Sequence, residues 1–153
     1  MEQAKLLQKI YRLLSQRVRS EKEIRDYLKR KKADIDVVEK IIDQLKQMSL
    51  IDDGKFAKDW VESRRRSRQK GIKALKIELL QKGIERQIIE EVISREILVV
   101  SETQVAERAL EMKMRVWKNF DQMNFKKKAI DFLLRKGFEY EVVKGVIDKF
   151  LRK

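Results

Sequence analysis

Apolar residues recur at helical spacing along the chain, and three stretches share one pattern. Each carries paired apolar residues at positions i, i+1, i+4 and i+5, which places a single apolar stripe on a helix of 3.6 residues per turn. This pattern predicts three equivalent helices, each with one face towards a core. The pairs are Val37-Val38 with Ile41-Ile42, Ile88-Ile89 with Val92-Ile93, and Val142-Val143 with Val146-Ile147.

The segment before each of these helices is repeated as well. Residues 79–85 (LLQKGIE) recur 54 residues later as 133–139 (LLRKGFE), and residues 28–34 form an earlier, more diverged copy. Gly83 and Gly137 fall just past the end of a helix, where a left-handed C-cap favours glycine. The repeated segment therefore predicts a helix, a tight turn and a second helix.

A further helix opens each unit, so the units have three helices each. Asp52 or Asp53 can N-cap a helix that carries Phe56, Ala57, Trp60 and Val61 on one face, and Ser101 with Gln104 can form a capping box before Val105, Ala106, Ala109 and Leu110. In the first unit Ser20 with Glu23 caps the second helix. We expect an all-α protein of three tandem three-helix repeats, at 3–51, 52–100 and 101–153, in one continuous and elongated repeat domain.

Composition narrows the chemistry that this chain can perform. Among its 153 residues there is no proline, which favours uninterrupted helices, and neither cysteine nor histidine. Disulfides, thiolate catalysis, the usual general base and the commonest metal ligand are therefore absent. The five glycines form no phosphate-binding motif, and helix capping explains Asp52 and Asp53 better than metal binding does. We expect no enzymatic activity, no metal, no cofactor and no small-molecule ligand.

Charge indicates the kind of partner. The chain has 38 Lys and Arg against 25 Asp and Glu, a net charge of +13. This excess favours an anionic partner, and nucleic acid is the first candidate. A membrane surface is the alternative anionic partner, but the longest aliphatic run, residues 97–100, is far shorter than the about 20 residues that span a bilayer. Residues 1–5 do not resemble the start of a signal peptide. We expect a cytoplasmic monomer without a membrane partner.

One stretch concentrates the positive charge. Residues 64–76 contain seven cations and no acid, and their guanidinium groups suit phosphates and carboxylates alike. The alternative is a solvated run whose arginines pair with Glu62 and with acids of a neighbouring unit. The candidate partner- and DNA-binding residues are Arg64, Arg65, Arg68, Lys70, Lys73 and Lys76. Two weaker basic patches are Lys29, Arg30, Lys31 and Lys126, Lys127, Lys128.

The two tryptophans have a simpler interpretation. We expect Trp60 and Trp117 to pack within or between units. For Trp117, which lies where the repeat offset places Arg68, contact with a partner is the alternative.

Leu50-Ile51-Asp52-Asp53, followed by Phe56-Ala57, Trp60, the arginines at 64–66 and Gly71, resembles the central signature of the RecX family, regulators of the bacterial RecA recombinase. Residues 20–24 with Leu28, residues 82–84 and residues 132–138 resemble its other motifs, so the resemblance covers nearly the whole chain. Two positions depart from the family pattern. Lys136 stands where the C-terminal motif usually has a second arginine, and Lys32 where the later units have glycine.

The resemblance implies tandem three-helix units in a curved, elongated array without enzymatic activity. It also implies binding in the groove of the RecA filament on DNA, with reduced ATPase, strand exchange and SOS-related activity of the recombinase. The residues by themselves leave an alternative open, a DNA- or RNA-binding protein that acts without a recombinase. In both cases contacts to DNA are expected to be non-specific and to involve phosphates.

Overall fold

The computed structural model describes residues 2–117 and 122–152, and over these residues the chain forms helices and no strand. This confirms the expected all-α class. The nine helices are α1 (Glu2–Gln16), α2 (Glu21–Arg30), α3 (Ile35–Gln47), α4 (Asp53–Arg68), α5 (Ile72–Gln81), α6 (Arg86–Val99), α7 (Glu102–Met114), α8 (Gln122–Arg135) and α9 (Tyr140–Leu151).

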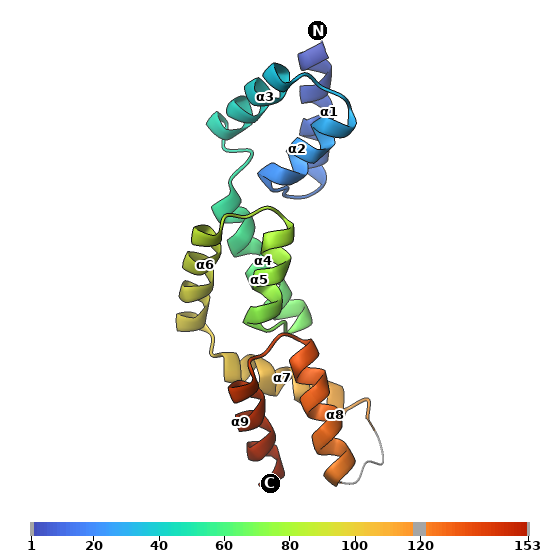
Figure 1. Cartoon of the computed structure of the whole chain (residues 1–153), viewed down its shortest axis with the longest axis vertical. Coiled ribbons are helices and arrows are strands. Elements are labelled where there is room, and N and C mark those ends of the chain that lie inside the picture. The colour runs from blue at the N-terminus through green and yellow to red at the C-terminus, as the bar shows by residue number, and fades with distance from the viewer. Residues whose placement is uncertain (1, 118–121, 153) are drawn as a thin grey trace.

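The helices are arranged as three groups of three that follow one another along the long axis of the molecule, with the two termini at opposite ends (Figure 1). We call α1–α3 the first unit, α4–α6 the second unit and α7–α9 the third unit. The elongated, curved array of three-helix repeats is thereby confirmed. A surface that runs along such an array is built from several units at once.

Each unit buries its own apolar core. The repeated stripes lie on α3, α6 and α9, where Ile42, Ile89 and Val143 are almost fully buried. Burial of such an aliphatic side chain contributes about 1.5–3 kcal/mol relative to exposure. The first core contains Leu6, Ile10, Ile24, Leu28, Ile41, Ile42, Leu45 and Ile51, the second Phe56, Ala57, Val61, Leu75, Leu79, Ile84, Ile89 and Ile93, and the third Val105, Ala106, Ala109, Leu110, Ala129, Leu133, Phe138, Val143, Val146 and Ile147.

Helix capping follows the sequence closely. Ser20 Oγ accepts a hydrogen bond from the Glu23 amide at 3.2 Å, and the Glu23 carboxylate accepts one from the Ser20 amide at 3.0 Å, which confirms the predicted capping box. Asp52 caps α4 by accepting from the Lys55 amide at 3.1 Å. Asp53 has a different role, because its Oδ1 accepts from the Glu21 amide of the first unit at 2.9 Å.

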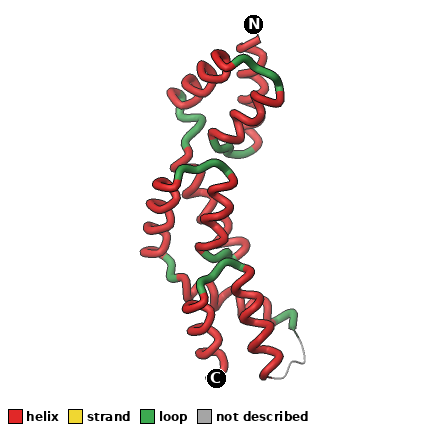
Figure 2. The backbone as a smooth tube through the Cα atoms, viewed as in Figure 1, coloured by secondary structure: helices red, strands yellow, loops and turns green. Residues whose placement is uncertain are grey.

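The two joints between units are built in the same way. At each joint the start of a unit's second helix lies against the turn between the second and third helices of the next unit, where Figure 2 shows the loops. Ser20 Oγ donates to the Lys82 carbonyl at 2.8 Å in the first joint. In the second joint the Gly71 amide donates to the Lys136 carbonyl at 2.8 Å and the Lys73 amide to the Gly137 carbonyl at 3.0 Å. The repeat thus extends to the contacts between units.

A carboxylate completes each joint by capping the first amide of the docked helix. Asp53 does so for α2, and Glu102 Oε2 accepts from the Ile72 amide of α5 at 3.2 Å. Both acids lie in the first turn of the next unit's opening helix. A negative charge beside a helix N-terminus is favourable because the first amides of the helix lack partners within it.

Glycine is required where the joints bring two backbones together. Gly83 and Gly137 have φ angles of 80° and 97°. A Cβ at Gly83 would lie 2.4 Å from the Lys22 Cβ, and one at Gly137 would lie 2.4 Å from the Ala74 Cβ. Lys32 occupies the equivalent turn with a φ of 59°, but it is exposed at the N-terminal end of the array. The docked helix, and not the turn alone, therefore accounts for the glycine in the second and third units.

Candidate functional site

The basic stretch 64–76 covers the end of α4, a short connection and the first half of α5, beside the third unit. Its cations have very different surroundings although they are close in sequence. Arg66, Arg68 and Lys73 are exposed, Arg64, Lys70 and Lys76 are half-buried, and Arg65 is buried. The seven cations of this stretch therefore do not form one continuous exposed ridge.

Arg65 differs most from the sequence expectation. It is 5% exposed, and its guanidinium pairs with the Glu102 carboxylate, lies 3.5 Å from Glu96 Oε1 and donates to the Val100 carbonyl at 3.2 Å. These contacts tie α4 to the end of α6 and the start of α7. Arg65 therefore follows the alternative given in the sequence analysis, in which arginines of the stretch pair with acids of a neighbouring unit. Its guanidinium is not available to a partner.

Arg64 and Trp60 form a stacked pair on the side of α4. The Arg64 guanidinium carbon lies 4.3 Å from the centroid of the Trp60 ring, a favourable cation–π distance. Trp60 also stacks on Phe56 and donates its indole N–H to Glu78 Oε1 at 2.9 Å. The expectation that Trp60 packs within its unit is confirmed.

Two further cations of the stretch have acidic neighbours on the same unit. Lys70 Nζ lies 3.7 Å from Glu78 Oε2, and Lys76 Nζ lies 3.4 Å from Glu90 Oε1. Ion pairs that remain accessible to solvent, as these two are, contribute little to stability. Both amines can therefore change partner when another anion approaches.

The weaker patches lie in two different units. Lys29, Arg30 and Lys31 are exposed at the end of α2, where the last two lie 5.6–6.0 Å from the Tyr27 ring centroid. Lys126, Lys127 and Lys128 are exposed on α8, and Lys128 Nζ lies 5.2 Å from the centroid of the Trp117 ring. Of these six residues, only Lys128 lines a cavity together with residues of the stretch 64–76.

That cavity, which we call the basic pocket, has a volume of about 480 Å³ and lies at the second joint. Among the described residues, six cationic and two aromatic side chains and no carboxylate form its wall. The sequence analysis singles out Arg68, Lys70, Trp117 and Lys128, but not the other four lining residues. The Lys-Gly turn shared by the repeats is the one sequence signal that could have indicated that residues near 136 approach residues near 70. The lining residues are Arg68, Lys70, Lys113, Trp117, Lys128, Phe132, Arg135 and Lys136.

Lys136 is half-buried at this joint and donates from Nζ to the Arg68 carbonyl oxygen. Burial lowers the pKa of Lys136, and the positive charges of Lys70, Arg68 and Lys113 lower it further. A charged lysine at this position would be stabilised by an incoming anion.

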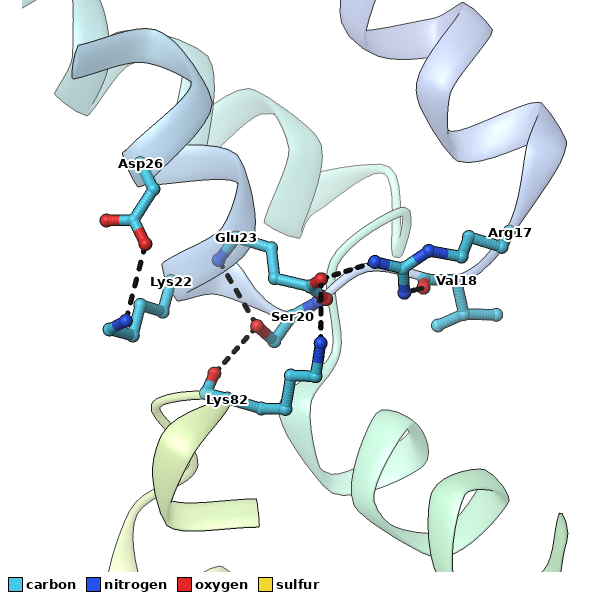
Figure 3. Close-up of polar contacts among 7 residues, drawn as sticks. All are labelled: Arg17, Val18, Ser20, Lys22, Glu23, Asp26 and Lys82. Carbon is cyan, nitrogen blue, oxygen red and sulfur yellow. Dashed lines mark hydrogen bonds and ion pairs between the residues drawn. The ribbon is translucent and has the colours of Figure 1, made fainter. Parts of the chain in front are cut away.

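The first joint, in contrast, balances its charges (Figure 3). Glu23 pairs there with Arg17, and its Oε2 lies 3.3 Å from Lys82 Nζ. Burial alone would raise the pKa of the Glu23 carboxyl, but the Ser20 amide, Arg17 and Lys82 bring it below its ordinary value. Two joints of the same construction therefore differ in one respect, because the described residues that line the basic pocket include no carboxylate.

The described residues provide neither a metal-binding cluster nor a helix that could span a membrane. No group of three or more acidic side chains is arranged to hold a metal ion, and none of the helices combines the length and the apolar character that a bilayer-spanning segment needs.

Comparison with known proteins gives one consistent family. Models of the first, second and third three-helix domains of RecX match residues 7–45, 52–93 and 101–147. The chain is 32% identical over 134 residues to a regulatory protein RecX of Finegoldia magna, covering 87% of this chain and 65% of that protein. It is 34% identical over 142 residues to that of Listeria welshimeri, covering 91% of this chain and 51% of that protein.

Solved structures agree with the sequence matches. A crystal structure of RecX from Lactobacillus salivarius aligns with a TM-score of 0.82 at 26% identity, covering 96% of this chain and 95% of the other. Another crystal structure of a regulatory protein RecX aligns with a TM-score of 0.80 at 27% identity, covering 95% of this chain and 71% of that one. The chain spans about half to two thirds of the length of the curated relatives named above.

Proposed function

Because this chain belongs to the RecX family, we propose that it regulates the RecA recombinase by binding in the groove of the RecA filament on DNA and lowering its ATPase, strand-exchange and SOS-related activity. The observation that carries the proposal is the match of all three units, in order, to the three RecX domains. An elongated array suits a helical groove because successive units can follow it. Regulation of this kind requires binding and no bond chemistry.

We place the filament contact on the cations around the second joint. Arg68 and Lys73 are exposed, and Arg64, Lys70 and Lys76 are half-buried beside them. Their partners would be carboxylates of the recombinase or phosphates of its DNA, both of which suit Arg and Lys. Arg65 is left out of this surface because its guanidinium already bridges Glu96 and Glu102.

The test is the single-stranded-DNA-dependent ATPase of the recombinase, measured with this protein at a sub-stoichiometric ratio. We expect the wild type to lower the ATPase rate and Arg68→Glu/Lys73→Glu to lose that inhibition, since attraction becomes repulsion at two exposed positions. Lys40→Glu/Lys144→Glu is the matched control, because it makes the same change of net charge at exposed positions of α3 and α9. Circular dichroism and melting temperature should be unchanged in both variants.

The outcomes separate the site from the function. Inhibition that survives Arg68→Glu/Lys73→Glu would remove these residues from the contact surface. A wild-type protein that binds free DNA or RNA but leaves the recombinase unaffected would favour the alternative, a nucleic-acid-binding protein that acts alone.

A further inference from the structure

We propose that the side of the second unit formed by α4 and α6 is a docking surface for an acidic amphipathic helix of a protein partner. The surface, which we call the lateral groove, consists of two adjoining cavities of about 710 Å³ and 550 Å³ that share Glu62, Glu96 and Val99. Among the described residues, none lines both the lateral groove and the basic pocket. The inference goes beyond the proposed function and does not depend on the filament contact placed around the second joint.

The floor of the lateral groove is aliphatic, because the apolar stripe of α6 is wider than its own core requires. Ile89 and Ile93 are buried in the second core, while Ile88 and Val92 beside them are half-buried and line the groove. At the end of the helix Val99 lines both cavities and is 80% exposed. A concave aliphatic surface that stays in contact with water is typical of a protein-binding site.

The exposed aliphatic end of α6 is specific to the second unit. The repeat offset of 51 residues places Lys46 and Gln47 of α3 where Ile97 and Leu98 stand in α6. Ile97 and Leu98 are 46% and 86% exposed, so the core of the unit does not account for them. An apolar run that the fold itself leaves unburied indicates burial against a partner.

The walls of the lateral groove select for an acidic partner. Five exposed cations line it, and none of the five forms an ion pair with a described carboxylate. Two exposed acids without an ion pair, Glu62 and Glu91, lie on the same walls, so unpaired cations outnumber unpaired acids by five to two. Glu96 is not counted, because it lies beside Arg65. The cations are Lys55, Lys58, Arg66, Arg95 and Arg108.

The dimensions of the lateral groove suit a helix. Gly54 and Arg66 line it near the two ends of α4 and lie about 18 Å apart along that helix at 1.5 Å per residue. That distance is about three turns of a docked helix. An extended segment would need a sheet edge to pair its backbone, and the described residues form no strand. A helix satisfies its own backbone and needs only aliphatic anchors at i, i+3, i+4 and i+7.

Other occupants match the lateral groove less well. A nucleic acid would bring phosphates towards Glu62 and Glu91 and has no aliphatic face for the floor. A lipid bilayer is flat on this scale, whereas the groove is concave. A second copy of this chain carries the same net charge of +13, so it would add positive charge to a surface that already has an excess.

The probe is a labelled synthetic peptide of about 18 residues, long enough to form a helix by itself, with leucines on one face and glutamates around them. A second peptide has the same composition but its leucines are spread around the helix. Fluorescence anisotropy with the full chain, without any recombinase, should show that the first peptide binds more tightly by about 10-fold or more. Methyl NMR spectra should show shifts at Ile88, Val92 and Val99 and none at Ile77, an exposed residue of α5 outside the groove.

Two variants test the floor and the walls separately. Val99→Ser should weaken binding of the amphipathic peptide by about 10-fold, because an aliphatic contact is lost, and Ile77→Ser is its matched control. Arg66→Glu/Arg108→Glu should weaken it as well, whereas Lys40→Glu/Lys144→Glu, with the same change of net charge on α3 and α9, should have a much smaller effect. All these positions are exposed, so melting temperatures should be unchanged. If a variant does not fold, the comparison of the two peptides and the methyl shifts decide the question.

Equal affinity for the two peptides, or methyl shifts that leave Val99 unmoved, would overturn the inference. A dimer in sedimentation experiments that Val99→Ser dissociates would assign the groove to a second copy instead. Binding to phosphatidylglycerol vesicles that Val99→Ser abolishes would assign it to a membrane, and either result would also overturn the inference. None of these measurements contains the recombinase, so failure here leaves the proposed function standing, and lost recombinase inhibition leaves the peptide result standing.

Discussion

Arg65→Ala is the substitution with the largest stability effect that we expect in the basic stretch. The Arg65 side chain is 4% exposed, and the carboxylates of Glu96 and Glu102 beside it are 13% and 14% exposed. Removing the guanidinium leaves two carboxylates close together with little access to water and leaves the Val100 carbonyl without this donor. Breaking a buried ion pair by deleting one partner costs about 3–5 kcal/mol.

The expected loss lies at the lower end of that range, because both carboxylates keep some access to water. We expect a reduction of about 3 kcal/mol in the free energy of unfolding. For a chain of this size that corresponds to a fall in melting temperature of about 6–12 °C. Arg65→Met should lose a similar amount, since it keeps most of the apolar bulk but not the charge.

The assay is urea unfolding followed by far-UV circular dichroism. Arg66→Ala is the matched control, because Arg66 is the next residue of α4 and is exposed, and its effect should stay within about 0.5 kcal/mol. Equal transition midpoints for Arg65→Ala and Arg66→Ala would refute the structural role given to the Arg65 guanidinium. A full loss in Arg65→Ala that is absent from Arg65→Met would show that packing, and not charge, stabilises this joint.

Three further predictions concern the joints and the shape of the molecule. Gly137→Ala should destabilise the fold by at least about 2 kcal/mol, because a left-handed backbone disfavours alanine and the added Cβ would meet Ala74. Lys32→Gly, at the equivalent turn of the first unit, should be nearly neutral, and similar melting temperatures for the two variants would contradict this prediction. The pKa of Glu23 is lowered in the folded state, so its contribution to stability should be present above its unfolded pKa of 4.5 and be lost as pH falls through the folded pKa. The unfolding free energies of the wild type and Glu23→Gln should therefore converge as pH is lowered. Curves that stay parallel would count against the ion pairs with Arg17 and Lys82. Small-angle scattering should give a radius of gyration above the ~15 Å of a compact chain of this length, and a monodisperse sample at ~15 Å would contradict an elongated monomer.

Much of the fold was predictable because its determinants are local. The paired stripes of α3, α6 and α9 have helical periodicity, and Ser20 and Asp52 cap helices through amides three residues away. The glycines at 83 and 137 indicated left-handed turns for the same reason. Each of these signals lies within one or two helical turns of sequence, so no knowledge of the tertiary arrangement was needed to interpret it.

The roles of the charged residues were not local in this sense. Arg64, Arg65 and Arg66 are consecutive, yet successive residues on a helix point about 100° apart, and only the positions of α6 and α7 decide which one is buried. Arg65 meets Glu96 and Glu102, while Arg64 lies on Trp60 of its own helix. Asp53 likewise caps a helix of another unit, a contact that its position at the start of α4 does not reveal.

The amino-acid sequence by itself determined the helices, their division into repeats, the family resemblance and the excess of positive charge. The tertiary structure alone decided where that charge gathers, because the second joint brings together residues as distant as Arg68, Lys113 and Lys136. The physical reason is that helix formation and capping depend on neighbours along the chain, whereas the energy of a charge depends on every group around it in space, including groups from other units.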